Sequence, residues 1–171
     1  MLRELVEQRE LRALGGTAFA VTPTLREAYA SGDDEELAEV AMGEAARAAL
    51  RLIAAERDAV TESTEEGAEE PAPAGAPVYR RAVIAADVIG AKLRPDLDDA
   101  VVRLSGPITY DRIASVHVDL AEAEPAVAKA VDVIDAADLG DPDAEFVLGD
   151  AEDHQLAWYA AQELPFLLEL L

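Results

Sequence analysis

The chain has 171 residues, which is enough to bury the core of one domain. Its 36 acidic residues against 14 basic ones give a net charge of −22, and this charge repels nucleic-acid phosphates and anionic lipid headgroups. There is no cysteine, which excludes disulfides, a thiol nucleophile and every zinc site that uses cysteine.

The first residues predict a cytoplasmic protein. Met1-Leu2-Arg3-Glu4-Leu5 carries charges where a secretion signal needs an apolar run. No stretch approaches the roughly 18 apolar residues of a membrane span. We therefore expect a cytoplasmic protein that binds neither membranes nor nucleic acid.

The first third of the chain predicts three helices and a strand. Residues 2–14 predict a short amphipathic helix, and residues 17–22 predict a strand. Thr24 is expected to cap a short helix over 25–30. Residues 33–57 predict a long amphipathic helix, because their apolar side chains cluster on one face and acidic residues occupy the first turn.

An acidic stretch then interrupts the pattern. Residues 59–77 contain five Glu, three Pro and two Gly, with no basic residue. Such a composition buries too little apolar surface to offset the entropy of ordering. We therefore expect residues 59–77 to be a disordered acidic linker within a single domain that spans 1–171.

The second half predicts three strands followed by two helices. Residues 82–86 form a continuous apolar run, typical of a strand covered on both faces, and residues 101–104 predict the next strand. Residues 115–120 alternate in polarity like a third strand. Helices are expected over 124–137 and 150–164. Together these elements predict an α+β fold, with a mixed sheet of about four strands and helices packed on it.

Three segments carry a resemblance to a known family. They are Thr-Ala-Phe-Ala-Val-Thr-Pro at 17–23, Ile-Ala-Ser-Val-His-Val-Asp at 113–119 and Glu-Asp-His-Gln-Leu-Ala-Trp-Tyr at 152–159. The chain resembles an uncharacterised actinobacterial family, a domain of unknown function, over nearly its whole length apart from the linker. The resemblance implies no activity, cofactor or site residue. It also implies a short strand ahead of the first helix, so we expect an edge strand to be missing before Met1.

Acidic and histidine side chains gather at the start of the predicted last helix. Asp150 as N-cap, with acids in the first turn, would satisfy free backbone N–H groups and complement the helix dipole. Glu152 and His154 would point to different sides of this helix, so a metal would need further ligands, and His117 with Asp119 is the only obvious source. We expect no metal and no cofactor, with His117, Asp119, Glu152 and His154 as the weak metal-ligating candidates.

Glu163 falls on the apolar face of the same predicted helix. A buried carboxylate must be paired or protonated, so we expect Glu163 to be buried in an ion pair with an arginine such as Arg81 or Arg103. The alternative is a functional carboxylate in a pocket. It keeps Glu163, together with His117 and His154, as a weak catalytic candidate.

Two apolar features near the C-terminal end are expected to be structural. Trp158 lies one helical turn from His154 in the predicted helix, and we expect it to be partly buried. Residues 164–171 are mostly large and apolar. We expect this tail to complete the core rather than to cover a partner, because monomers seldom expose large apolar patches.

Ser115, His117 and Asp119 share one face of a predicted strand, which raises the question of a catalytic triad. Neighbours on one strand face are about 6.5–7 Å apart and point in parallel, so we expect them to be out of hydrogen-bond reach. The chain also has no Gly-x-Ser-x-Gly elbow, phosphate-binding loop or dinucleotide fingerprint.

The leading functional hypothesis is a non-enzymatic cytoplasmic interaction or regulatory protein, which acts as a homodimer or with another protein. A metal-assisted or acid/base enzyme that uses His117, His154, Glu152 and Glu163 is the first alternative. An acidic mimic of nucleic acid is the second, and it needs regularly spaced rows of negative charge on the folded surface. The acid in the linker and at helix starts argues against the mimic.

Overall fold

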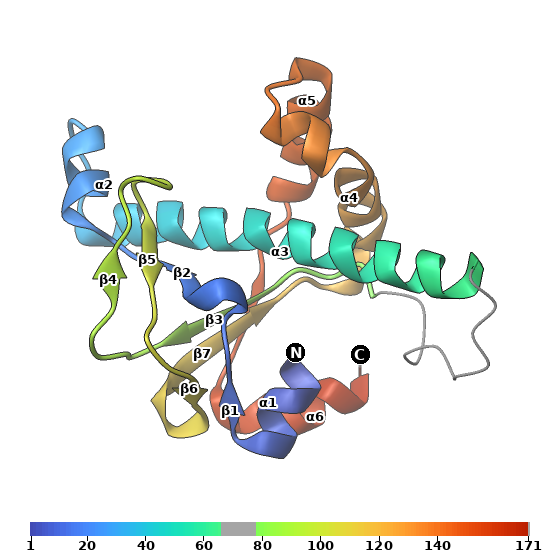
Figure 1. Cartoon of the computed structure of the whole chain (residues 1–171), viewed down its shortest axis with the longest axis horizontal. Helices are drawn as coiled ribbons and strands as arrows, with labels where there is room; N and C mark the ends of the chain where they lie inside the picture. The colour runs from blue at the N-terminus through green and yellow to red at the C-terminus, as the bar shows by residue number, and fades with distance from the viewer. Residues whose placement is uncertain (66–77, 171) are drawn as a thin grey trace. The chain divides into compact units, whose positions relative to one another are not determined.

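The computed structural model describes residues 1–65 and 78–170 and contains two compact units (Figure 1). Unit 1 combines Met1–Ala46, Val83–His117 and Trp158–Leu171, and unit 2 combines Arg47–Ala82 and Val118–Ala157. The predicted α+β class is confirmed. In place of one mixed sheet of about four strands, short strands form three small antiparallel sheets packed against helices.

Unit 1 begins with α1 (Leu2–Gln8), which ends six residues earlier than predicted. Arg9 adopts a left-handed conformation with φ 59°, and its N–H donates to the Leu5 carbonyl. The Arg9 carbonyl accepts a hydrogen bond from Tyr110 N–H. The guanidinium of Arg9 lies 3.5 Å from the centre of the Tyr110 ring. These contacts take Arg9 out of the helix, because tertiary interactions override local propensity.

Two antiparallel sheets follow in unit 1. The first pairs β1 (Glu10–Leu11) with β6 (Ile108–Thr109). The second has the order β2-β5-β4, formed by β2 (Thr17–Phe19), β5 (Val101–Arg103) and β4 (Lys92–Leu93). A short 3-10 helix at Leu14–Gly16 connects β1 to β2, and another at Tyr110–Arg112 follows β6. The strand predicted at 101–104 is present as β5.

A third sheet has the order β3-β7-β8. It contains β3 (Ala82–Ala86), β7 (Ile113–Val118) and β8 (Ala157–Tyr159). Strand β3 matches the prediction at 82–86, and β7 overlaps the strand predicted at 115–120 but begins and ends two residues earlier. In β7, Val116 and Val118 are buried as the alternation predicts.

The helix α2 (Pro23–Ala28) is capped by Thr22 rather than by the predicted Thr24. The Thr22 hydroxyl accepts a hydrogen bond from Leu25 N–H at 3.0 Å and donates one to the carbonyl of Asp99. This cap ties α2 to the turn before β5. Leu25 then packs in a small apolar cluster with Leu37 and Ala100.

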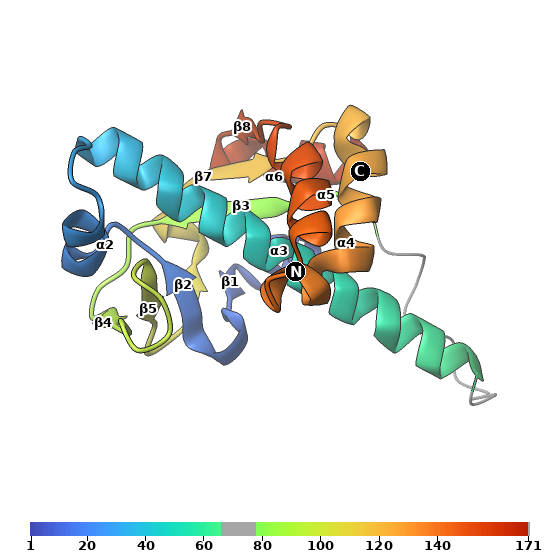
Figure 2. The same ribbon diagram turned by 90° about the horizontal axis from the view of Figure 1, so that it is seen from above.

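The long helix α3 (Asp34–Glu65) confirms the strongest prediction from the sequence and extends it (Figure 2). Its start is fixed by Asp33, whose carboxylate accepts hydrogen bonds from the N–H groups of Glu35 and Glu36. Residues 59–65 of the predicted linker are helical, and residues 66–77 lie outside the described part of the chain. None of the helices formed by the described residues combines the length and the apolar composition needed to cross a membrane.

Unit 2 is built around a helical hairpin of α4 (Glu124–Asp138) and α5 (Pro142–Glu152), and a short 3-10 helix, Ala121–Ala123, leads into it. The predicted helix over 124–137 is thus confirmed. Asp141 caps α5 by accepting hydrogen bonds from the N–H groups of Asp143 and Ala144. The core of this unit contains Leu50, Ile53, Ala54, Ala123, Val127, Ala130, Val131, Ile134, Ala137, Ala144, Leu148 and Ala151.

The predicted helix over 150–164 is wrong. The helix α5 already ends at Glu152, and strand β8, a 3-10 helix (Ala161–Glu163) and α6 (Leu164–Leu170) follow. The carbonyl of His154 accepts a hydrogen bond from the Arg81 guanidinium, a tertiary contact that the local pattern cannot reveal. Helical spacing therefore does not apply beyond Glu152.

The prediction that the apolar tail completes the core is correct for part of the tail. Leu164 and Leu167 of α6 are buried, and α6 lies beside α1 in unit 1 (Figure 1). Phe166 of the same helix is exposed. The tail thus contributes one face to the core.

Gly16 is the glycine whose replacement we expect to be costly. It has φ +70°, and a Cβ built on it would lie 2.8 Å from the Leu104 carbonyl oxygen. Gly15 has φ +60°, but its Cβ would meet nothing closer than 3.8 Å. Gly15→Ala should therefore lose about 1–2 kcal/mol through backbone strain alone, and Gly16→Ala should lose clearly more in urea unfolding. Equal losses would show that the Leu104 backbone yields without cost.

Candidate functional site

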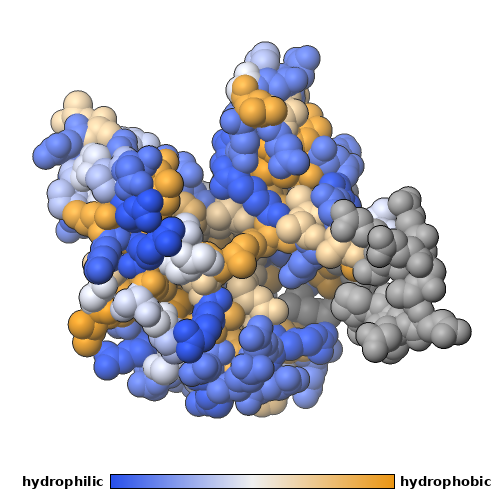
Figure 3. All heavy atoms as spheres, viewed as in Figure 1, coloured by the Kyte–Doolittle hydropathy of each residue, from blue (hydrophilic) through white to orange (hydrophobic). Residues whose placement is uncertain are grey.

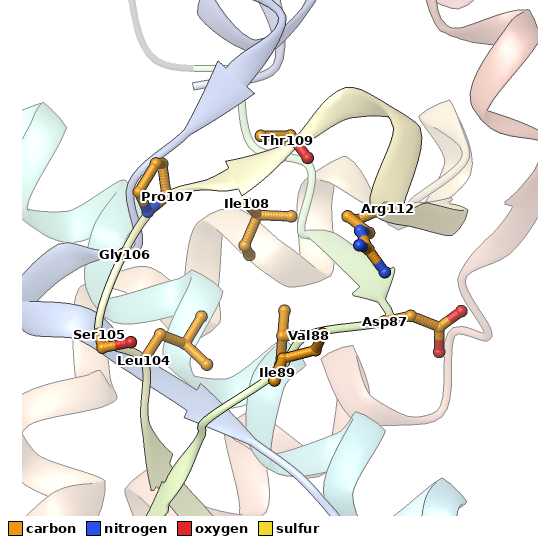
Figure 4. Close-up of a pocket in the computed structure, with 10 residues that line it drawn as sticks. All are labelled: Asp87, Val88, Ile89, Leu104, Ser105, Gly106, Pro107, Ile108, Thr109 and Arg112. Atoms are coloured by element: carbon orange, nitrogen blue, oxygen red, sulfur yellow. The ribbon is translucent and has the colours of Figure 1, made fainter.

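A hollow in the surface of unit 1 has a volume of about 200 Å³. Its lining comes from the turn after β3, the turn after β5, strand β6 and the end of the 3-10 helix that follows β6 (Figure 4). The lining residues are Asp87, Val88, Ile89, Leu104, Ser105, Gly106, Pro107, Ile108, Thr109 and Arg112.

The chemistry of the hollow is divided between an apolar part and a charged end. One side of the hollow is apolar and contains Val88, Ile89, Leu104 and Ile108 (Figure 4). The charged residues Asp87 and Arg112 lie at the other end. Ile108 is buried at the base, whereas Ile89 is 84% exposed at the rim. The hollow can therefore take up an apolar group and present polar atoms beside it.

Backbone contacts hold these walls in place. Asp87 N–H donates to the Arg112 carbonyl at 2.8 Å, which joins the end of β3 to the start of β7. Leu104 N–H donates to the Gly16 carbonyl at 2.7 Å. The absence of a side chain at Gly16 permits this close approach.

Ser115 and His117 form a second polar site in unit 1. Ser115 Oγ lies 3.0 Å from His117 Nε2, so the prediction that these side chains are out of reach is wrong. The imidazole is long enough to bridge the distance between two neighbours on one strand face. In the described ranges, no carboxylate hydrogen bonds to the His117 ring. The pair therefore lacks the third group that orients the base of a catalytic triad.

His117 is expected to titrate below the usual range of histidine. Burial lowers the pKa of His117 from 6.5, because desolvation disfavours the imidazolium form. Since the folded pKa is depressed, the contribution of His117 to stability is full above about pH 6.5 and is lost as the pH falls through the folded pKa. A proton NMR titration of the His154→Gln variant, which retains one histidine, should give a midpoint below 6.5. A midpoint at or above that of an unfolded reference peptide would contradict this expectation.

Asp119, the third member of the tested triad, is committed to a buried ion pair in unit 2. Its Oδ2 accepts hydrogen bonds from Arg81 Nε and Arg81 N, and its Oδ1 accepts from Arg81 Nη2, each at 2.8 Å. The two side chains are 3% and 0% exposed. Arg81 Nη2 also donates to the His154 carbonyl. Both oxygens of the Asp119 carboxylate accept hydrogen bonds from Arg81. We therefore interpret Asp119 as a structural residue.

The remaining candidate residues, Glu163, Glu152 and His154, form no catalytic arrangement among the described residues. Glu163 is exposed, and its Oε2 accepts a hydrogen bond from Ala160 N–H at 2.8 Å, so the prediction of a buried Glu163 paired with arginine is wrong. Glu152 is exposed at the end of α5, and His154 follows in the turn of unit 2. His117 belongs to unit 1. Across residues 1–65 and 78–170, no group of three or more His, Asp or Glu side chains is arranged to hold a metal ion.

Trp158 differs from its prediction as well. It lies in strand β8 rather than in a helix, and 61% of it is exposed. The predicted partly buried position one helical turn from His154 is therefore wrong. Trp158 is therefore a surface residue of unit 1.

Comparison with known proteins decides the family. A family of unknown function, DUF6912, matches residues 1–168. The chain belongs to this family. The predicted resemblance to a domain of unknown function is thereby confirmed for DUF6912. No curated protein and no solved structure matches the chain.

The residues that line the hollow of this DUF6912 protein were not among the candidates from the sequence. One signal could have revealed them: Val88 and Ile89 are two large apolar residues between Asp87 and Gly90, in a segment that reads as a turn. An apolar pair in a turn cannot serve the core of the preceding strand. In the structure both side chains are exposed, Ile89 more than Val88.

Proposed function

We propose that this DUF6912 protein is a non-enzymatic cytoplasmic interaction protein. Its hollow in unit 1 takes up one large apolar side chain from an extended segment of a basic protein partner. The observation that carries this proposal is the size of the hollow together with its apolar wall.

The size favours a side chain over a cofactor or metabolite. Small-molecule sites usually enclose about 300–1,000 Å³, whereas this hollow has about 200 Å³. A cavity of about 150 Å³ is enough for a benzene ring. One leucine or phenylalanine side chain therefore fits the available volume.

The rim of the hollow offers further apolar surface and polar groups to a peptide segment whose apolar side chain occupies the hollow. Ile89 is almost fully exposed and extends the apolar wall outward. Asp87 and Arg112 stand at the other end, where they offer an acceptor and a donor to the backbone of a bound segment. A few polar groups around an apolar anchor give orientation and specificity.

Charge favours a basic partner over a second copy. Two copies that each carry −22 repel one another, whereas a segment rich in Lys or Arg is attracted. The enzyme alternative gains no support from its two acidic residues, since Glu152 is exposed at the end of α5 and Glu163 caps a turn.

The test uses two ten-residue peptides. Both carry one Lys near each end in a Gly/Ser background, and the central residue is Leu in one and Ser in the other. Titration into the ¹⁵N-labelled full chain should shift the amide signals of Val88, Ile108 and Thr109 with the Leu peptide and not with the Ser peptide.

A matched pair of variants localises the binding. A Cβ at Gly106, in the wall, or at Gly43, on α3, would meet no heavy atom within 4 Å, so both glycines accept Trp without a backbone clash. Gly106→Trp should fill the hollow and abolish the shifts, whereas Gly43→Trp should preserve them. Equal responses to the Leu and Ser peptides, or unaltered binding by Gly106→Trp, would reject the proposal.

A further inference from the structure

The solvent-facing side of α5 in unit 2 combines one aromatic residue with three carboxylates. Asp143, Phe146, Asp150 and Asp153 follow one another at steps of three, four and three residues, so they form one stripe on the helix surface. All four are exposed, and Phe146 is 76% exposed. We call these four residues the α5 stripe.

The opposite face of α5 shows that the stripe is not part of the core. Ala144, Leu148 and Ala151 are buried there and pack in the core of unit 2. Phe146 thus has no packing role that would explain an aromatic residue at its position. A single exposed apolar residue is common, so the argument depends on the charges around it.

The arginines of unit 2 are already committed to other acids. Arg47 binds Glu145 and Asp138, and its hydrogen bond lowers the pKa of Glu145. Arg51 binds Asp138 as well. The remaining pairs are Arg57 with Asp58 and Asp132, Arg80 with Glu124, and Arg81 with Asp119.

Acidic residues far outnumber basic residues in the sequence around the stripe. Residues 118–157 contain twelve acidic residues, and Lys129 is their only basic residue. Within the described ranges, no Lys or Arg forms an ion pair with Asp143, Asp150 or Asp153. In Figure 3 the outer surface of the α4–α5 hairpin is largely hydrophilic, with a hydrophobic spot exposed within it.

We propose that the α5 stripe is an interaction surface for an arginine-rich segment of a protein partner. One guanidinium lies flat on the Phe146 ring, where the ring quadrupole attracts a cation. Its neighbours in the segment bind the aspartates on either side. Arginine suits both contacts because its planar group stacks on aromatic rings and forms paired hydrogen bonds with carboxylates.

The spacing of the stripe sets the spacing of the arginines. Asp143 and Asp150 are seven residues apart, which corresponds to roughly 10 Å along a helix axis. An extended segment covers about 10 Å in three residues, so the outer arginines of an Arg-x-x-Arg segment span the two aspartates, and a third arginine placed between them reaches Phe146. This surface lies in unit 2 and is independent of the hollow proposed above.

The experiment measures binding of a fluorescent peptide with three arginines at this spacing to the full chain by fluorescence anisotropy at low and physiological salt. Phe146→Leu keeps an apolar side chain but removes the ring, so affinity should fall about two- to fivefold. Asp143→Asn/Asp150→Asn should weaken binding further and reduce its dependence on salt.

The control removes the same charge elsewhere. Glu35 and Glu39 are exposed on α3 in unit 1, and Glu35→Gln/Glu39→Gln changes the net charge as much as the double aspartate variant does. This control should bind the arginine peptide like the unmodified protein. A peptide with lysines in place of the arginines should bind more weakly to the unmodified protein and lose little affinity with Phe146→Leu.

Two results would overturn the proposal. If the α3 control weakens binding as much as Asp143→Asn/Asp150→Asn, the peptide responds to net charge and not to the stripe. If Phe146→Leu leaves arginine-peptide affinity unchanged while circular dichroism shows intact folding, the aromatic contact does not exist.

Discussion

Asp119→Asn is expected to destabilise the protein by about 3–5 kcal/mol, because it leaves the Arg81 guanidinium buried without its counter-charge. The pair has both side chains almost completely enclosed, and it forms two side-chain hydrogen bonds of 2.8 Å. Asparagine keeps the shape of the side chain, so the loss reports the charge rather than a cavity. Urea unfolding, followed by circular dichroism, measures the change.

The matched control is the ion pair of Arg80 with Glu124, whose side chains are 19% and 41% exposed. Glu124→Gln should cost no more than about 1 kcal/mol, since water screens this pair. The double variant Arg81→Met/Asp119→Leu should be more stable than Asp119→Asn, because it removes both charges together. If Asp119→Asn and Glu124→Gln behave alike, the buried pair does not contribute as inferred.

Leu164→Ala is expected to cost about 2–5 kcal/mol, because it deletes a large side chain that is fully enclosed in unit 1 and leaves a cavity. Phe166→Ala, two residues further along α6, should change stability by no more than about 0.5 kcal/mol, since 70% of Phe166 is exposed. Chemical denaturation of both variants under one condition provides the comparison. A larger loss for Phe166→Ala would mean that the outer face of α6 is covered in solution.

The sequence predicted best those elements whose pattern depends on their own residues. The long helix α3 and the helix α4 were both identified, because their apolar residues recur at helical spacing along many turns. Helix α1 was overextended because the contact of Arg9 with Tyr110 involves residues about a hundred positions apart. No local pattern encodes such a contact.

The predicted buried ion pair named Arg81 as one of two possible arginines, but its acid, Glu163, was wrong, and the partner of Arg81 is Asp119. Helical spacing placed Glu163 on an apolar face, but that spacing fails after Glu152, where α5 ends. Asp119 was assigned to the polar face of a strand that ends one residue earlier, at Val118. Once the strand has ended, alternation no longer predicts where a side chain points, and Asp119 turns to Arg81.

The hollow illustrates a different limit of sequence reasoning. It is made by two turns, strand β6 and the 3-10 helix after it, which come together partly through the pairing of short strands. Strands of two or three residues carry too little pattern to fix their partners. The α5 stripe, in contrast, follows from one helix. Its residues could have been found from the sequence if the boundaries of α5 had been placed correctly.

The discontinuity of unit 1 has a consequence for biosynthesis. Thr17 of β2 pairs with Arg103 of β5, and residues from Trp158 onward complete the same unit. The chain is synthesised at about 5–20 residues per second, so unit 1 is incomplete for roughly 7–30 seconds between the synthesis of Thr17 and that of Leu164. The α4–α5 hairpin, whose residues are adjacent in the sequence, needs no such delay.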